Sequence, residues 1–186
     1  MQNYVLNDKW TLRLHYKDLG NCYNENLEKL MDINDIFTFW QTFNNIPKLH
    51  EIFSDGVNCK KMKRNMATPC AYSFFKNDID PCWENEKNSN GYEISIRSCK
   101  DFSNFHDLWL NILISLIGNQ CECYRFVNGV RAVDCTKRSS VMYRIEIWLE
   151  DENMRNSIDK EVINSLNISN YKTLFRSHKN VKENII

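Results

Sequence analysis

A tryptophan and a glutamate stand side by side in a segment that otherwise has the composition of a surface loop. The segment contains Asn-Asp, Asp-Pro and Asn-Gly pairs, which are typical of turns in solvent. Trp83 directly precedes Glu84 in this loop. An indole face attracts a flat cation, and the neighbouring carboxylate accepts hydrogen bonds. The pair therefore predicts a site for a planar, positively charged ligand that carries hydrogen-bond donors.

A 7-methylated guanine has these properties. Methylation at N7 leaves the ring positively charged, and the Watson–Crick edge offers N1–H and the N2 amino group to one carboxylate. A simpler interpretation is a loop tryptophan that folds back over the sheet, next to a solvated glutamate. Both interpretations place the pair between two strands, because residues 72–75 are aromatic and residues 92–96 alternate apolar with polar side chains.

The sequence predicts seven strands, several of them from alternation of apolar and polar residues. These are residues 10–16, 27–31, 72–75, 92–96, 129–137, 141–150 and 171–178. In residues 141–150, the apolar side chains of Tyr143, Ile145 and Ile147 point to one face. Trp148 points to the other, polar face. If helices cover the apolar face, Trp148 lies on the side that faces solvent, where a ligand would bind.

Helical periodicity predicts three helices. The first begins at a cap, Asn34 or Asp35, and ends before Pro47, the second begins at Asp101 or Ser103, and the third covers residues 153–166. The core stripe of the second helix consists of Phe105, Leu108, Trp109, Ile112 and Leu116. Three further apolar residues of that helix fall outside the stripe: Leu110, Ile114 and Ile117. They are either covered by another part of the protein or offer a binding groove.

Strands and helices without regular alternation along the chain predict an α+β fold.

The composition limits the class of protein. A chain of 186 residues with 42% apolar residues fits a single domain, residues 1–186. Twenty-four basic residues balance 24 acidic ones, so binding to nucleic acid by bulk charge is not expected. No segment resembles a signal peptide, and the apolar run at residues 108–117 is too short to span a bilayer. We therefore expect a cytoplasmic protein that does not bind membranes.

Two further groups of residues have more than one interpretation. The eight cysteines are scattered, and Cys121-x-Cys123 lacks the two-residue gap of zinc knuckles, so reduced thiols are favoured over a metal or disulfide framework. Residues 49–71 are expected to form a long loop. The basic run at residues 60–64 is either a solvated charge patch or a contact for RNA phosphates. No catalytic motif, metal site or cofactor site is predicted.

The sequence D-P-C-W-E-N-E-K at residues 80–87 resembles a motif of the cap-binding translation initiation factor 4E family, which there ends in W-E-D-E-K. The resemblance also covers, in order, W-T-L, D-I-F-T-F-W, L-W-L-N-I-L-I-S-L-I-G, I-E-I-W and S-H. It implies a curved, mostly antiparallel sheet with three helices on the convex face and a slot for the mRNA cap on the concave face. It also implies a monomer without enzymatic activity that binds 7-methylguanosine and recruits a scaffold factor to start translation.

The resemblance assigns residues to three parts of this function. The cap base would stack between Tyr23 and Trp83, pair with Glu84, and contact Trp148 at its methyl group; alternatively, Tyr23 is an ordinary loop residue. Candidates for the cap phosphates are Arg131, Lys137, Arg138, Arg144, Lys179 and Lys182. A groove for a helical peptide of factor 4G or a 4E-binding protein would contain Leu6, Ile36, Trp40, Leu110 and Ile114. Alternative functions are a cap-binding repressor that does not engage the scaffold and a cap-processing enzyme.

Overall fold

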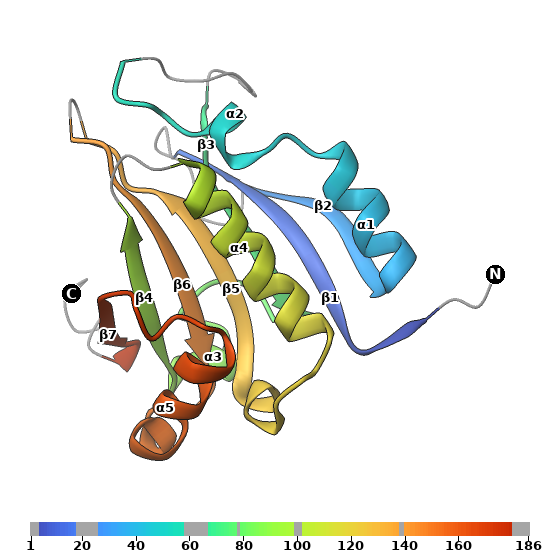
Figure 1. Ribbon diagram of the computed structural model, residues 1–186, viewed down its shortest axis with the longest axis vertical. Coiled ribbons are helices and arrows are strands. Elements are labelled where there is room, and N and C mark those ends of the chain that lie inside the picture. The colour runs from blue at the N-terminus through green and yellow to red at the C-terminus, as the bar shows by residue number, and fades with distance from the viewer. Residues whose placement is uncertain are drawn as a thin grey trace.

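Seven strands form one sheet in which every neighbouring pair is antiparallel. The computed structural model describes residues 4–17, 26–57, 67–77, 79–98, 102–137 and 140–179. The strand order is β2-β1-β3-β5-β6-β4-β7, and Figure 1 shows the sheet as an open, twisted surface. The strands are β1 (Val5–Tyr16), β2 (Leu27–Asp35), β3 (Pro69–Lys76), β4 (Tyr92–Ser98), β5 (Val127–Asp134), β6 (Tyr143–Leu149) and β7 (Thr173–Ser177).

Three longer helices cover one face of this sheet (Figure 1). They are α1 (Ile36–Asn45), α4 (Phe102–Ile117) and α5 (Arg155–Ser165). Each contributes side chains to the same buried core, for example Phe39, Ile112 and Val162. Shorter elements are α2 (Leu49–Ile52), α3 (Glu86–Ser89) and the 3₁₀ helices Glu122–Phe126 and Glu152–Met154. The predicted α+β fold, with three main helices on the convex face, is confirmed. In the described ranges, no helix is both long enough and apolar enough to cross a membrane.

The alternation predicted for the first strand decides which side chains enter the core. Trp10, Leu12 and Leu14 of β1 belong to the main apolar core, whereas Thr11 and His15 point to the opposite face. Both faces of β1 are nevertheless covered, because Thr11 and His15 are also buried. The imidazole of His15 is hydrogen-bonded to the Ser73 hydroxyl of β3 at 2.9 Å. The face opposite the helices is therefore polar and partly enclosed.

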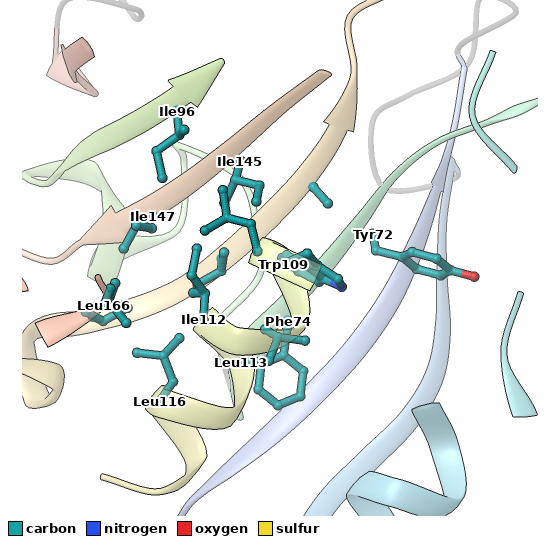
Figure 2. Close-up of a cluster of buried hydrophobic side chains, with 14 of the residues drawn as sticks. Tyr72, Phe74, Ile96, Trp109, Ile112, Leu113, Leu116, Ile145, Ile147 and Leu166 are labelled. Atoms are coloured by element: carbon teal, nitrogen blue, oxygen red, sulfur yellow. The ribbon is translucent and has the colours of Figure 1, made fainter. Parts of the chain in front are cut away.

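Helix α1 begins at a predicted cap, and helix α4 packs as its sequence predicts. Asp35 caps α1, because its carboxylate accepts a hydrogen bond from the backbone N–H of Thr38 at 2.8 Å. All five residues of the predicted α4 stripe are buried: Phe105, Leu108, Trp109, Ile112 and Leu116. Figure 2 shows Trp109 and Ile112 of α4 beside Ile145 and Ile147 of the sheet. This packing holds the helices on one face and leaves the other face for the site.

Several predicted boundaries are wrong. The expected loop at 49–71 contains α2, whose Leu49 and Ile52 are buried, and its last residues already belong to β3; the basic run at 60–64 lies outside the described residues. β2 extends to Asp35, well beyond its predicted end. β5 ends at Asp134, and Lys137 makes only an isolated bridge to Ser140. β6 and β7 are each shorter than predicted.

The expectation of reduced thiols is wrong for one pair of cysteines. Cys121 and Cys123 are joined by a disulfide at the start of a 3₁₀ helix. Their sulfur atoms and the Glu161 carboxylate all lie within 4.8 Å of one another. Bonded sulfur atoms offer no thiolate, so this cluster is not a metal site in the form described. Three other cysteines in the described ranges are free: Cys70, Cys82 and Cys135.

A glycine in β5 makes room for the aromatic cluster behind the site. A Cβ atom at Gly129 would lie 2.2 Å from Cγ of Phe75. Phe75 is fully buried, and its ring meets the ring of Trp148 edge-on, with centroids 5.4 Å apart. The glycine therefore allows three strands to bring Phe75 and Trp148 together.

Gly129→Ala is expected to lower the free energy of unfolding by about 1–3 kcal/mol, because the added methyl group overpacks this cluster. Urea denaturation measures the change. Gly118→Ala, at the end of α4, is the matched control. A Cβ atom there would lie 3.1 Å from the Ile114 carbonyl oxygen and would touch no ring, so a smaller loss is expected. Equal stability of Gly129→Ala and the wild type would contradict this account of the packing.

Candidate cap-binding site

A cavity of about 360 Å³ opens on the face of the sheet opposite the helices. It is lined by Pro81, Cys82, Trp83, Glu84, Arg131, Arg144, Glu146, Trp148 and Arg176. We call it the Trp83 cavity. Five of these residues were predicted as site residues from the sequence: Trp83, Glu84, Arg131, Arg144 and Trp148. The cavity thus combines aromatic rings, carboxylates and guanidinium groups from one loop and three strands.

Buried amides fix the loop that carries Trp83 and Glu84. The side-chain amide of Asn88 donates to the carbonyl oxygens of Asp80 and Cys82 at 2.8 and 2.9 Å. The Asn128 amide donates to the Asn88 side chain at 3.1 Å, and Nδ1 of His178 donates to the Asn88 carbonyl at 2.8 Å. Because buried polar groups stabilise a structure only when they are paired, this network holds the loop in one conformation. Sequence reasoning missed it, because asparagines in such a loop look like ordinary turn residues.

Trp83 presents part of its ring to the cavity. The ring is half-buried and packs against a small apolar cluster of Phe75, Ile79 and Trp148, separate from the main core. Its indole N–H has no hydrogen-bond partner among the residues described. Glu84, the next residue, is exposed. A supported aromatic face beside an accessible carboxylate is the arrangement that the sequence predicted.

Trp148 lies on the predicted side of the sheet but is not open to solvent. Its side chain is only 1% exposed, because Phe75 and His178 cover the ring. The indole N–H donates to Oε2 of Glu146 at 3.2 Å. The expectation that Trp148 faces solvent is therefore wrong, although a small part of the residue borders the Trp83 cavity.

A buried ion network lies beneath the cavity. Oε2 of Glu146 is 3.3 Å from Nη1 of Arg131, and Oε1 pairs closely with Arg144. Burial alone would raise the pKa of Glu146, but these two guanidinium groups hold it below its usual value. Glu93, also buried, has its pKa raised to about 6 by burial and by the charge of Glu146. Three arginines and two glutamates line the cavity, so its side chains carry a net positive charge that suits an anion.

Of the other predicted phosphate residues, the two that the structure describes do not line the Trp83 cavity. Lys137 is exposed beyond the end of β5. Lys179 lines a separate polar cavity of about 490 Å³ with Glu86, Lys87, Asn90, Glu150, Asp151 and Asn153. Arg138 and Lys182 lie outside the described residues, as does Tyr23, the predicted second stacking ring. Arg176, by contrast, was not predicted and lies in the cavity.

The predicted peptide groove lies on the helix-covered face. Ile36 and Trp40 of α1 are each 40% exposed, and Leu110 and Ile114 of α4 are half-buried. Leu6 is 9% exposed and belongs to the main core. It therefore packs beneath this surface and contributes little exposed area to it. Phe37 of α1 is also exposed, and so are two apolar residues that sequence reasoning missed: Tyr4 and Val5. The backbone N–H of Ile36 bonds to the carbonyl of Tyr4, which joins the chain before β1 to the start of α1.

Comparisons with known proteins agree with this architecture. The family model described as eukaryotic initiation factor 4E matches residues 5–185. Human eukaryotic translation initiation factor 4E is 27% identical over 123 residues, which cover 65% of this chain and 50% of the human protein. The factor 4E of Eremothecium gossypii is 30% identical over 148 residues, which cover 78% and 62% of the two chains. The chain spans about half the length of the first curated relatives that it matches.

Two solved structures have the same fold. Ascaris suum eIF4E-3, in complex with m7G cap, superposes with a TM-score of 0.76 at 18% identity, covering 95% of this chain and 92% of the other. A schistosome eIF4E, complexed with m7GpppA and 4E-BP, gives a TM-score of 0.74 at 21% identity, covering 98% and 92%. With the family match over nearly the whole chain, the conclusion is that this protein belongs to the eukaryotic initiation factor 4E family.

Proposed function

We propose that this chain binds the 7-methylguanosine 5' cap of mRNA in the Trp83 cavity and recruits a scaffold initiation factor 4G to start translation. The observation that carries the proposal is the adjacency of Trp83 and Glu84 in one cavity with Arg131 and Arg144. Two solved structures with this fold are complexes of family members with m7G cap and with m7GpppA. A supported ring, a carboxylate and basic groups in one cavity match the three chemical parts of a cap.

Each part of the cavity has a task in this proposal. The cationic base stacks on Trp83, a contact worth about 1–3 kcal/mol. Glu84 accepts hydrogen bonds from N1–H and the N2 amino group and offsets the positive charge of the base. Arg131 and Arg144 attract the triphosphate, since guanidinium groups bind phosphate oxygens in pairs. Tyr23 is proposed as the second stacking ring, and Trp148 as the contact for the methyl group.

The proposal also covers the binding of a partner peptide and the state in which the protein acts. The surface of Ile36, Trp40, Leu110 and Ile114, supported by Leu6, is proposed to bind a helical peptide of factor 4G or of a 4E-binding protein. We propose that the chain acts as a monomeric, cytoplasmic, single-domain binding protein over residues 1–186, without catalytic activity, metal or cofactor. Lys137, Arg138, Lys179 and Lys182 remain proposed contacts for the cap phosphates, although Lys137 and Lys179 do not line the Trp83 cavity.

Retention on immobilised 7-methyl-GTP tests cap binding. We expect the protein to be retained, to elute with free 7-methyl-GTP, and to stay bound when GTP is added at the same concentration. The physical reason is that only the methylated base is cationic, and a cation gains more from an indole face and a carboxylate. Equal elution by the two nucleotides would mean that the site does not recognise the methylated base.

A further inference from the structure

An arginine that the sequence did not predict contacts the proposed stacking ring. Arg176 belongs to β7, the edge strand of the sheet, where it is in register with Glu93 of β4. Its guanidinium carbon lies 5.1 Å from the centroid of the Trp83 ring. Both side chains line the Trp83 cavity. A guanidinium group is itself flat and cationic, so it meets the chemical requirements for binding to an indole face.

Arg176 is held less firmly than the other two cavity arginines. Arg131 and Arg144 are both ion-paired to the buried carboxylate of Glu146. Arg176 is exposed, and within the described part of the chain its guanidinium has no hydrogen bond or ion pair. Besides the attraction of the Glu93 charge on the neighbouring strand, its contact with Trp83 is the interaction that holds it in place. An exposed contact of this kind stabilises a structure by only about 0.5–1 kcal/mol, so the side chain can leave the ring at low cost.

We propose that Arg176 is an internal competitor for the cap base, and that it changes roles when the ligand carries phosphates. We place the methylated base on the face of Trp83 that Arg176 contacts. Two cations cannot occupy that face at once, so the base must displace the guanidinium. A phosphate chain offers the displaced group a stronger partner, because a charge-assisted pair exceeds a cation–π contact in water. Arg176 then opposes ligands that consist of the methylated nucleoside alone and favours those with a polyphosphate. The inference rests on the proposed cap binding and adds selectivity for the phosphate chain.

The test compares two ligands, 7-methylguanosine and 7-methyl-GTP, on the wild type and on Arg176→Gln. Removing the competitor should tighten binding of 7-methylguanosine by about two- to fivefold, the factor that corresponds to an exposed cation–π contact. The same substitution should weaken binding of 7-methyl-GTP by about threefold or more, because a charge-assisted phosphate contact is lost. Isothermal titration calorimetry measures both dissociation constants without depending on tryptophan fluorescence. A sign change between the ligands is not expected from a residue that only supports the fold.

Arg155→Gln is the matched control. The guanidinium of Arg155 lies 4.3 Å from the centroid of the Phe175 ring and 3.5 Å from the Asp159 carboxylate, so the same type of contact, together with an ion pair, is removed outside the cavity. Both dissociation constants should stay at their wild-type values. Arg176→Lys, which keeps the charge but not the planar group, should retain most of the affinity for 7-methyl-GTP.

The outcomes separate this inference from the proposed function. If wild-type protein binds 7-methyl-GTP and Arg176→Gln changes both affinities in the same direction, or neither, the competitor role is wrong and cap binding stands. If the wild type does not prefer 7-methyl-GTP to GTP, the proposed function itself fails, and the competitor role fails with it. Opposite changes for the two ligands, with no change in Arg155→Gln, support the inference.

Discussion

Glu84→Gln is expected to weaken 7-methyl-GTP binding by at least about 2 kcal/mol, roughly a 30-fold rise in the dissociation constant. Glutamine keeps the shape of glutamate but removes the charge and replaces one acceptor with a donor. The edge of the methylated guanine offers two donors to this position, so one of them would face an amide N–H. Titration of the folded variant with 7-methyl-GTP measures the change.

Glu86→Gln provides the control for Glu84→Gln. Glu86 is an exposed carboxylate two residues later, in α3, and it lines the separate polar cavity instead of the Trp83 cavity. Its replacement removes the same charge from the same segment and should leave affinity within about twofold, since exposed charges interact weakly through water. Unchanged affinity in Glu84→Gln would reject its role, and an equal loss in both variants would indicate a general effect of charge.

Trp40→Ala is expected to abolish detectable binding of a Tyr-x-x-x-x-Leu-φ peptide, in which φ is an apolar residue, while cap affinity stays within about threefold. Partly exposed tryptophans commonly dominate helix-binding surfaces, and their truncation costs 2 kcal/mol or more, about 30-fold in affinity. Trp40 is 40% exposed and makes an edge contact with Phe39 of the core, with ring centroids 5.2 Å apart. Peptide binding can be measured by fluorescence anisotropy and cap binding by calorimetry.

Gln41→Ala is the control for Trp40→Ala. It changes the next residue of α1, which is exposed, and should preserve both peptide binding and cap binding. A melting curve of each variant separates a lost contact from a lost fold. If Trp40→Ala keeps its melting temperature and still binds the peptide, the groove is misplaced. A parallel loss of cap and peptide binding would show that Trp40 supports the core through Phe39.

Local patterns predicted most of the fold, because each pattern reflects the surface that a segment buries. Alternation in residues 10–16 correctly predicted a strand, in which Trp10 and Leu12 enter the core, and the stripe on α4 is buried as predicted. Strand lengths were less accurate, because β2 continues on pairing with β1 beyond its predicted end. Pairing of that kind depends on a partner strand and cannot be recognised in a single segment.

The site was predicted in part, since its motif residues are adjacent in the sequence and its other members are not. Trp83 and Glu84 stand together in one loop, and the resemblance led to Trp148, Arg131 and Arg144. Arg176 was missed because its contact with Trp83 exists only when β7 pairs with β4. Alternation also predicted the face of the sheet on which Trp148 lies. It did not predict that Trp148 is buried, because the rings that cover it, Phe75 and His178, come from distant segments.

A crystal structure of the protein with 7-methyl-GTP would test the central claim most directly. We predict that the base stacks on Trp83, that its N1–H and N2 amino group donate to Glu84 at about 2.7–2.9 Å, the usual length for such charge-assisted bonds, and that the phosphates lie near Arg131 and Arg144. A bound nucleotide whose base lies elsewhere on the protein, with Trp83 and Glu84 uncontacted, would contradict the account.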